Sequence, residues 1–400
     1  MSERILVLNV GSSSLRVAAF ERPTRAAVLV AMVERIGAGE ALLRLERPGG
    51  AGGAPPRVEP VAARDHEQAL RVLLERLERE GLSQAGVVAV GHRVVHGGER
   101  YADPVVVTDE VLAEIGRAAD LAPLHNPYNL LGIEAARRVF PGVPHVAVFD
   151  TAFHATLPPV AHLYAIPYHL YHRHRIRRYG FHGTSHAYVR HHLPKLLGGR
   201  LPARIVSLHL GNGASSCAIL EGRSVDTSMG LTPLEGLVMG TRSGDIDPAV
   251  IGHLVGREEM TVGEALALLN QQSGLRGVSG LSGDVRDLLG AEARGEERAK
   301  LALDLYCYRI RKGIGACAAA LGGLDAIAFT AGVGENAAAI RARALGGLEF
   351  LGVEVDGARN SELVGGKEGV FHRGRVVLAV IHTDEAWLIA TQTARVAGLL

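Results

Sequence analysis

The chain has 400 residues, of which 47% are hydrophobic, and its 43 Lys and Arg nearly balance its 42 Asp and Glu. A single hydrophobic core stops growing below this length, so two domains are expected. The formal charge of +1 offers no basic excess for a nucleic acid or an anionic membrane, so small molecules are the expected partners. No apolar run reaches the ~20 residues of a membrane span, and no secretory signal is visible. With three cysteines that lack CxxC spacing, these features predict a cytoplasmic protein.

A short apolar run, a turn rich in glycine and serine, and a second apolar run open the chain. Ile5–Leu8 and Leu15–Phe20 are expected to be strands, because both runs are short and end at turn residues. Gly11 lets the backbone of the turn approach a bound group closely, so the turn is a candidate for holding a phosphate or a hydrated metal. Most turns of this composition are only turns. A similar hairpin, Ser207–Ser216, lies about two hundred residues later, however, which suggests gene duplication.

Strands and helices alternate between these hairpins, which predicts a mixed or parallel sheet with helices on its faces. The expected elements are a helix over Asp65–Glu80, a strand over Gly86–Val95, a helix from Thr108, a helix from Pro127 to Phe140 and a strand over His145–Phe149. One face of the first helix should be buried through Ala69, Leu70, Leu73, Leu74 and Leu77. The last strand places Asp150 at its C-terminal end, where ligands collect in open α/β sheets.

The second half of the chain repeats this alternation. Its expected elements are strands over Ala203–Leu210 and Cys217–Leu220, helices from Asp247 and Thr261, a long helix over Glu296–Leu321, a strand over Asp325–Thr330, a turn over Ala331–Asn336, a helix over Ala337–Leu345, a strand over Val376–Ile381 and a final helix over Ala386–Val396. Asp247 is the expected N-cap of its helix, with Pro248 at the first helical position. Thr261 and Glu264 have the spacing of a capping box.

The glycine-rich turn near the C-terminus has two interpretations. It follows a strand and precedes a helix, which is typical of an anion or nucleotide site at a helix N-terminus. It also fits G-x-G-x-x-A through Gly332, Gly334 and Ala337, with Glu354 about twenty residues further on, so a dinucleotide-binding oxidoreductase is the alternative. Against that alternative, the fingerprint is a single partial copy far from the start of a domain. A Walker-type phosphate loop is absent from the sequence.

Charged residues inside glycine-rich turns are the candidates for chemistry. Phosphoryl transfer needs positive charge on the phosphoryl oxygens, a metal that bridges the phosphates, and an aligned acceptor. Arg93 and Arg242 could supply the charge, and His182 has small neighbours that leave room for a ligand. Asp150 is a candidate general base or orienter, and Glu385 is a candidate metal carboxylate. Each residue also has a structural alternative. The arginines could form ion pairs with neighbouring acids, and the histidine could be structural. Asp150 could cap the following turn, and Glu385 could belong to the first turn of the last helix.

Nine motifs in order resemble those of the acetate kinase family, within the superfamily of sugar kinases, Hsp70 and actin. They are LNVGSSSL, GHRVVHGGE, APLHNP, FDTAFH, YGFHGTSH, HLGNGAS, MGTRSGDIDP, FTAGVGEN and TDE, and they cover nearly the whole chain. The resemblance implies an α/β fold of two duplicated ribonuclease-H-like (actin-like ATPase) domains around a central cleft. It implies an N-terminal acyl and phosphate domain over residues 1–150, on which the C-terminal helix at 386–400 packs back, and a nucleotide-binding domain over residues 151–385.

The resemblance also implies an activity: reversible transfer of the γ-phosphoryl group of ATP to acetate by direct in-line displacement, giving acetyl phosphate and ADP. Mg²⁺ is the implied metal, with Mn²⁺ as a substitute, and the implied assembly is a homodimer. Propionate kinase and butyrate kinase are the nearest alternatives, because they differ only in the volume of the acyl pocket. A nucleotide-binding switch without catalysis is a third interpretation, but it would not need both arginines and the histidine.

The family's functional positions transfer to this chain motif by motif. The implied catalytic residues are Arg93, Asp150, His182 and Arg242. The implied acetate pocket comprises Arg93, Val95, Leu124, Phe181 and Pro233. The implied metal residues are Asn9 and Glu385. The implied nucleotide and phosphate residues are Ser12, Arg16, His209, Gly211, Asn212, Gly213, Asp284, Val285, Arg286, Gly332, Gly334 and Asn336.

Three positions depart from the family pattern. Arg16 stands where lysine is usual, and the two cations bind phosphate with different geometry. Asp384 replaces the usual asparagine and adds negative charge beside Glu385. Val285 replaces an aromatic residue, which affects adenine packing and therefore nucleotide preference.

Overall fold

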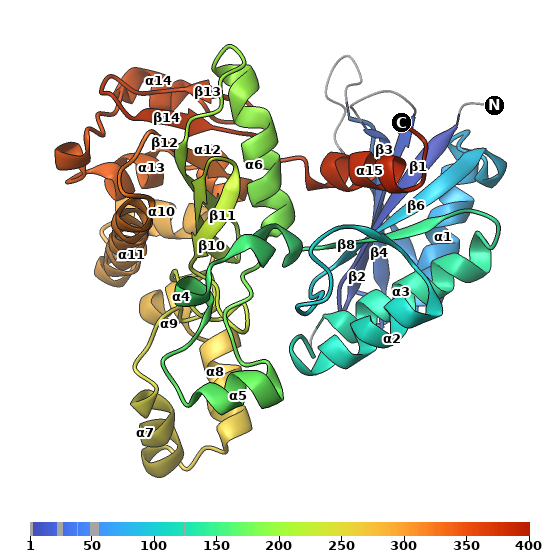
Figure 1. Ribbon diagram of the computed structural model, residues 1–400, viewed down its shortest axis with the longest axis horizontal. Coiled ribbons are helices and arrows are strands. Elements are labelled where there is room, and N and C mark those ends of the chain that lie inside the picture. The colour runs from blue at the N-terminus through green and yellow to red at the C-terminus, as the bar shows by residue number, and fades with distance from the viewer. Residues whose placement is uncertain (1–2, 22–26, 38, 49–55, 124) are drawn as a thin grey trace. The chain divides into compact units, whose positions relative to one another are not determined.

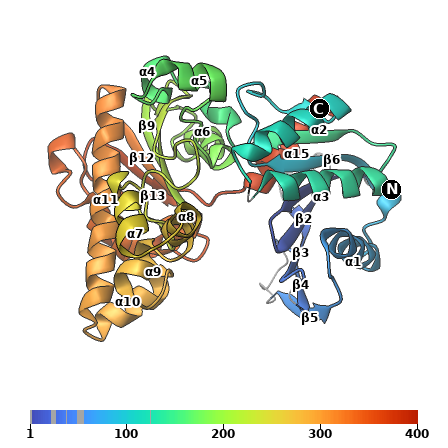
Figure 2. The same ribbon diagram turned by 90° about the horizontal axis from the view of Figure 1, so that it is seen from below.

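The computed structural model describes residues 3–21, 27–37, 39–48, 56–123 and 125–400. The chain forms two compact units, of which the first comprises Met1–Ala152 and Asp384–Leu400 and the second comprises Phe153–Thr383. Each unit contains a mixed β-sheet with helices packed against it (Figures 1 and 2). Among the described residues, no helix is both long and apolar enough to cross a membrane.

The sheet of the first unit has the strand order β5-β4-β3-β2-β1-β6-β8-β7. Strands β1 to β5 are joined by antiparallel pairing, whereas β1, β6 and β8 are parallel neighbours. The strands are β1 (Arg4–Val10), β2 (Ser14–Glu21), β3 (Ala27–Glu34), β4 (Ala41–Glu46), β5 (Arg57–Val61), β6 (Val87–Val94), β7 (Val105–Val106) and β8 (His145–Phe149).

The sheet of the second unit has the order β11-β10-β9-β12-β14-β13. Strands β9, β10 and β11 pair antiparallel, and β9, β12 and β14 are parallel neighbours. The strands are β9 (Arg204–Leu210), β10 (Ala214–Leu220), β11 (Arg223–Thr227), β12 (Ala326–Thr330), β13 (Gly369–Val370) and β14 (Val377–Val380).

The two sheets share one topology. In each, three antiparallel strands are followed across the sheet by two strands parallel to the first, so β3-β2-β1-β6-β8 corresponds to β11-β10-β9-β12-β14. The first hairpin turns also correspond, because Gly11 N–H donates to Ser14 O in one (2.8 Å) and Gly211 N–H donates to Gly213 O in the other (3.0 Å). This repetition confirms the predicted duplicated ribonuclease-H-like fold.

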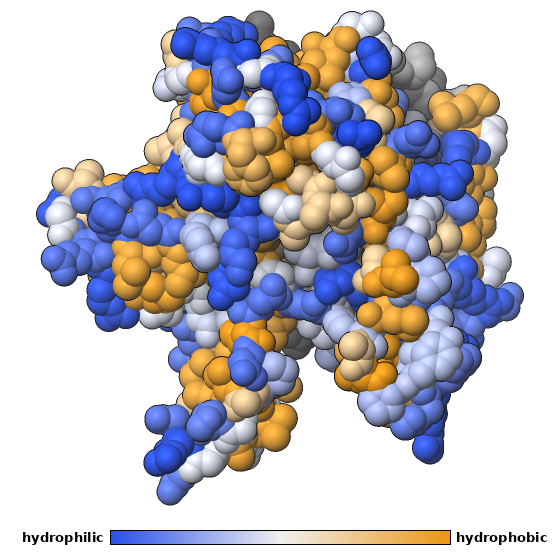
Figure 3. All heavy atoms as spheres, turned by 60° about the vertical axis from the view of Figure 1, so that its left-hand side comes forward, coloured by the Kyte–Doolittle hydropathy of each residue, from blue (hydrophilic) through white to orange (hydrophobic). Residues whose placement is uncertain are grey.

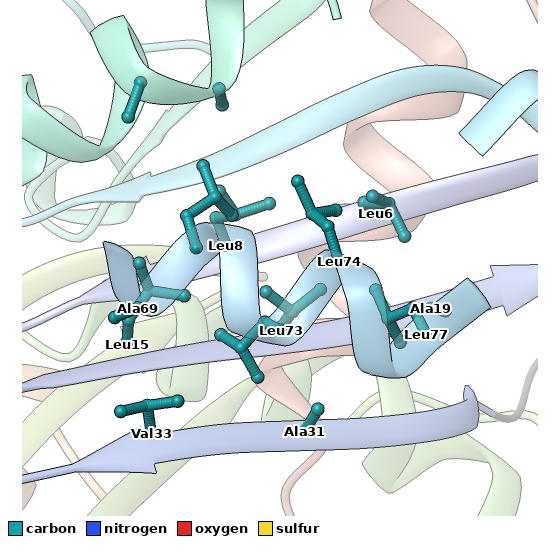
Figure 4. Close-up of a cluster of buried hydrophobic side chains, with 14 of the residues drawn as sticks. Leu6, Leu8, Leu15, Ala19, Ala31, Val33, Ala69, Leu73, Leu74 and Leu77 are labelled. Carbon is teal, nitrogen blue, oxygen red and sulfur yellow. The ribbon is translucent and has the colours of Figure 1, made fainter. Parts of the chain in front are cut away.

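Helices cover both faces of the first sheet. Asp65 caps α1 (His66–Arg79) by accepting from Gln68 N–H, and the buried face of α1 consists of the five residues predicted from the sequence. These side chains pack against Leu6 and Leu8 of β1 (Figure 4). The other helices of this unit are α2 (Asp109–Arg117), α3 (Asn126–Val139) and α15 (Glu385–Val396), with short 3₁₀ turns η1 (Gln84–Gly86) and η2 (Ala118–Asp120).

The C-terminal helix α15 lies on the opposite face of the same sheet. Ile5 and Val7 of β1 alternate with the residues that face α1, and they form a second buried cluster with Ile389 of α15. A side chain on Gly91 of β6 would come within 2.3 Å of Thr393 Oγ1, so glycine permits the close approach of α15.

Helices also surround the second sheet. They are α4 (Pro159–His162), α5 (Tyr168–His174), α6 (Gly183–Leu196), α7 (Ala249–Arg257), α8 (Val262–Gln271), α9 (Gly274–Ser279), α10 (Val285–Ala293), α11 (Glu297–Leu321), α12 (Ala331–Asn336), α13 (Ala338–Leu345) and α14 (Gly357–Glu362), with 3₁₀ turns η3 (Ala152–Thr156) and η4 (Glu349–Leu351). The predicted capping box of Thr261 and Glu264 is present at the start of α8. On the face drawn in Figure 3, hydrophilic and hydrophobic side chains are interspersed.

Several predicted boundaries were wrong, among them that of the strand expected from Cys217, which begins at Ala214. Ala331–Asn336 is a short helix rather than a turn, because the buried carboxylate of Glu335 accepts from Ala331 N–H and stabilises a first helical turn. The helix expected from Asp247 begins at Ala249, although Asp247 still accepts a hydrogen bond from Ala249 N–H. The final helix begins at Glu385, because Asp384 accepts from Trp387 N–H and acts as its N-cap.

Candidate active site

The predicted site residues divide between the two units. Those in the first unit are Asn9, Ser12, Arg16, Arg93, Val95, Asp150 and Glu385, and those in the second are Phe181, His182, His209, Gly211, Asn212, Gly213, Pro233, Arg242, Asp284, Val285, Arg286, Gly332, Gly334 and Asn336. Leu124, predicted to line the acetate pocket, lies outside the described residues.

In the first unit, three polar residues meet at the C-terminal ends of the parallel strands β1, β6 and β8. Arg93 Nε donates to Asp150 Oδ1 at 3.2 Å, and Arg93 Nη2 donates to the other carboxylate oxygen. Arg93 Nη1 points to Asn9 Oδ1 at 3.4 Å. The fork of the guanidinium therefore engages both oxygens of Asp150, which fixes the plane of the Arg93 side chain.

The electrostatics of this cluster favour a charged arginine. Burial alone would lower the pKa of Arg93, but the negative charges of Asp150 and Glu385 outweigh it and raise the pKa. Asp150 is only 1% exposed, so removal of Arg93 would leave its carboxylate buried without its cationic partner, at a cost of about 3–5 kcal/mol. Glu385 begins α15 directly after the cap Asp384. The acid at position 384, noted above as a departure, thus has a local structural role.

The other predicted residues of the first unit differ in their exposure to solvent and in their contacts. Arg16 of β2 is exposed and pairs with Asn9 across the hairpin. Ser12 is exposed in the turn. Val95 is buried, and its N–H donates to Asn129 Oδ1 at 3.0 Å. Asn129 also donates to Val10 O, so this buried amide, which the sequence reasoning did not single out, links β1 to β6 beside Arg93.

In the second unit, His182 and Arg242 converge on one glycine. A Cβ atom on Gly213 would lie 3.4 Å from His182 Nε2 and 3.4 Å from Arg242 Nη1. His182 precedes α6 with a φ of 55°, a left-handed conformation that is uncommon outside glycine and typical of strained functional positions. Its Nδ1 lies 2.9 Å from Ser215 Oγ, and its ring stacks on His209 with centroids 4.0 Å apart.

Arg242 is held by backbone and sulfur rather than by an acid. Its Nη1 donates to Pro233 O at 3.1 Å and contacts Met239 Sδ at 3.9 Å, and no carboxylate of the described residues forms an ion pair with it. Burial lowers its pKa. A partly dehydrated guanidinium without an acidic partner is a suitable binding group for an anion.

Beside this pair lies a cavity of 770 Å³ in the second unit, a size that fits a nucleotide. Its predicted lining residues are Gly211, Asn212, Asp284, Val285, Arg286, Gly332 and Asn336, and its further lining residues are Leu275, Gly283, Leu289, Val333 and Ala337. The wall is thus apolar on one side and formed by glycine-rich turns on the other. Asp284 caps α10, and its ion pair with the exposed Arg286 lies at the surface, where such a pair adds little stability.

Two residues behind this cavity were missed by sequence reasoning. Arg341 is completely buried, and its guanidinium donates to the carbonyls of Gly334 and Glu335 at the end of α12 and to Leu363 O. Burial lowers the pKa of Arg341 to about 10. The carboxylate of Glu335 accepts from Ala331 N–H, Thr383 N–H and His382 Nδ1. An arginine on a helix is usually exposed, so nothing in the local sequence indicated this role.

The duplicated topology and the nucleotide-sized cavity define the class of the protein as an actin-like ATPase fold of two ribonuclease-H-like units. Residues 4–391 match the model of the acetokinase family, and the chain belongs to that family. It is 47% identical to the acetate kinase of Bacillus thuringiensis subsp. konkukian (strain 97-27) over 401 residues, covering 99% of both chains.

Solved structures agree with this assignment. The crystal structure of Porphyromonas gingivalis acetate kinase matches with a TM-score of 0.92 and 41% identity, covering 99% of this chain and 100% of that one. A propionate kinase from Francisella tularensis subsp. tularensis SCHU S4 matches with a TM-score of 0.92 and 38% identity, covering 98% and 99%. Membership of a kinase family removes the oxidoreductase alternative.

Proposed function

We propose that this protein is an acetate kinase that transfers the γ-phosphoryl group of ATP to acetate and catalyses the reverse reaction. The observation that carries the proposal is the turn Gly211–Gly213. Gly211 and Asn212 line the nucleotide-sized cavity, and Gly213 lies against both His182 and Arg242. One short turn thus joins a nucleotide site to a guanidinium and an imidazole that can act on a terminal phosphate.

The chemistry needs no strong general base, because the attacking carboxylate of acetate is already an anion. Direct in-line displacement then depends on alignment and on stabilisation of charge at the phosphoryl oxygens. In the second unit, Arg242 and His182 would supply that stabilisation. In the first unit, Arg93 would bind the carboxylate of acetate, with Asp150 holding its guanidinium plane.

The residues of the first unit suit a magnesium ion. Asn9 and Glu385 offer oxygen ligands, and Mg²⁺ binds through one or two carboxylates together with waters and substrate phosphates. Within the part of the chain that the structure describes, no cluster of three or more His, Cys, Asp or Glu residues could form an all-protein metal cage. When bound, the ion would neutralise part of the phosphate charge.

The nearest alternatives to the proposal are propionate kinase and butyrate kinase, which act on acids with longer acyl chains. Val95 of the first unit and Phe181 of the second are buried, and Pro233 of the second is half-buried, so each unit offers an apolar side chain of the kind that the family resemblance assigns to a short acid. A matched structure named propionate kinase has the same TM-score as one named acetate kinase, so the fold does not separate these substrates. One methylene changes affinity by about 1–3 kcal/mol in such pockets.

One experiment tests the proposal. The purified protein is incubated with Mg·ATP and with acetate, propionate or butyrate in separate reactions, and the acyl phosphate is trapped with hydroxylamine. We expect product with acetate at the highest kcat/KM, and loss of product when EDTA removes the metal. Larger kcat/KM with propionate or butyrate would reassign the substrate, and no product with any of the acids would refute kinase activity.

We further propose that the enzyme is a homodimer, as the family resemblance implies. Leu301 and Tyr308 are seven residues apart on α11, so they share one helical face, and they are 57% and 55% exposed. Apolar side chains exposed to this extent on one helix are suited to contact with a second copy. Light scattering after size-exclusion chromatography should give twice the chain mass, and a monomer mass at micromolar concentration would contradict this assignment.

A cytoplasmic location completes the proposal. Cys217, Cys307 and Cys317 are all free, and free thiols persist in reducing compartments. Burial raises the pKa of Cys307 and of Cys317 to about 12, so both remain protonated and unreactive. Cell fractionation with an antibody against the protein would test the location.

A further inference from the structure

A chain of buried hydrogen bonds runs away from His182 into the interior of the second unit. His182 Nδ1 lies 2.9 Å from Ser215 Oγ, and Ser215 Oγ lies 2.9 Å from His186 Nε2. His186 Nδ1 in turn lies 2.8 Å from Ser207 Oγ. Ser215, His186 and Ser207 are completely buried. Nothing in this chain touches the nucleotide cavity, so it acts on the reaction only through His182.

The number of protons in this chain restricts how it can be arranged. Burial, together with the neighbouring His154 and His209, lowers the pKa of His186 well below its usual value, so His186 is neutral and carries one N–H. Ser215 also has a single hydroxyl proton, and it faces two imidazole nitrogens. If both histidines donated to Ser215, its buried hydroxyl proton would have no acceptor, so one histidine donates to Ser215 and Ser215 donates to the other. The direction of one hydrogen bond therefore sets the direction of the next.

Three arrangements satisfy this condition, and two of them leave a proton on His182 Nε2. In the first, His186 donates to Ser215, Ser215 donates to Nδ1 of His182, and the neutral His182 holds its only proton on Nε2. In the other two, Nδ1–H of His182 donates to Ser215 and Ser215 donates to His186; a cationic His182 then also has a proton on Nε2, whereas a neutral His182 has a lone pair there. Phosphate oxygens repel that lone pair, so a bound phosphoryl group favours the two arrangements with a proton on Nε2.

We propose that Ser215 and His186 are positioning residues that hold the His182 ring and keep Nε2 a hydrogen-bond donor to the transferring phosphoryl group. This inference rests on the proposed kinase function. Other groups that face His182 include the stacked ring of His209 from β9 and the guanidinium of Arg242 beyond Gly213. Because Ser215 can either donate to Nδ1 or accept from it, Ser215 contacts the His182 ring in each of these arrangements.

The test uses Ser215→Ala with Ser216→Ala as its matched control. Ser216 is the next residue of β10, is equally buried and projects from the opposite face of the strand. We expect kcat of Ser215→Ala to fall about tenfold, the effect of one hydrogen bond, with KM for ATP and acetate changed less than about threefold. The kcat–pH profile should shift in Ser215→Ala and stay unchanged in Ser216→Ala. Equal kcat and equal pH profiles in the two variants would overturn the proposal.

A second pair of variants covers the case in which Ser215→Ala fails to fold. His186→Gln keeps a polar group near the position of Nε2, whereas His186→Leu removes it, so the glutamine variant should retain more kcat than the leucine variant. Equal loss in both would overturn the role of His186.

A readout without catalysis separates this inference from the proposed function. In ¹⁵N-histidine NMR of the wild-type protein with bound Mg·ADP, neutral His182 should carry its proton on Nε2. A proton on Nδ1 would refute the inference even if the enzyme is active. If the proton is on Nε2 but the protein has no kinase activity, the result would refute the proposed function and leave the inferred position of the proton intact.

Discussion

His96 should make the first unit sensitive to acid, and His96→Asn should remove that part of the sensitivity. The His96 side chain is completely buried, and burial lowers its pKa to about 4. Gly98 N–H donates to Nδ1 of His96 at 3.0 Å, so protonation of this nitrogen would also break a hydrogen bond. Asparagine places an oxygen near the position of Nδ1, so it can keep this bond without titrating.

The magnitude follows from the two pKa values. The unfolded chain binds a proton at His96 near pH 6.5, whereas the folded chain does so only near pH 4, so the unfolded state holds more protons between these values. The free energy of unfolding therefore falls as the pH falls through this window. Between pH 7.5 and pH 5.0 the loss from His96 is about 2 kcal/mol.

A single fluorophore allows the measurement. Trp387 is the only tryptophan of the chain, and it packs against the buried cluster of β1 and α15 in the same unit as His96. Urea unfolding is followed by the fluorescence of Trp387 at pH 7.5 and at pH 5.0. The decrease in the free energy of unfolding between these two pH values should be about 2 kcal/mol smaller in His96→Asn than in the wild type. Burial also lowers the pKa values of His92 and His145. Both residues are present in the wild type and in the variant, so their contributions cancel when the two pH dependences are compared. The same pH dependence in both proteins would refute the reasoning.

Three further variants test the site. Arg242→Ala should lower kcat by about 10³-fold, as loss of an arginine that stabilises a transferring phosphoryl group does, with little change in Tm; near-normal kcat would remove Arg242 from catalysis. Val95→Ala should widen the acyl pocket and raise kcat/KM for propionate relative to acetate, and an unchanged ratio would place Val95 outside the pocket. Arg341→Met leaves the carbonyls of Gly334 and Glu335 without a donor, so it should raise KM for ATP more than KM for acetate and lower stability by about 3 kcal/mol, measured by steady-state kinetics and urea unfolding; an unchanged KM for ATP would show that these carbonyls do not shape the cavity.

Several features of this protein follow from the sequence alone. The buried face of α1 repeats with helical spacing, and its cap at Asp65 and the capping box at Thr261 depend on residues three positions apart. The strand end at Asp150 and the glycine turns at Gly11 and Gly211 are equally local. Short-range hydrogen bonds and periodic burial determine such features, so they can be read before any fold is known.

Other features exist only in the folded chain. Arg93 and Asp150 are 57 residues apart, and their ion pair forms because β6 and β8 are parallel neighbours with aligned ends. The buried Arg341 and the contact between Ser215 and His186 also join distant segments. Even the helix over Ala331–Asn336 depends on Glu335, which is held by Thr383 from another part of the unit.

The turn Gly211–Gly213 likewise has some features that the sequence determines and others that only the fold determines. Its glycines were evident in the sequence, but its position between a cavity and the pair His182 and Arg242 was not. The physical reason is that composition and spacing specify which groups are available, whereas desolvation, charge pairing and the sharing of protons depend on which groups the fold brings within a few ångströms.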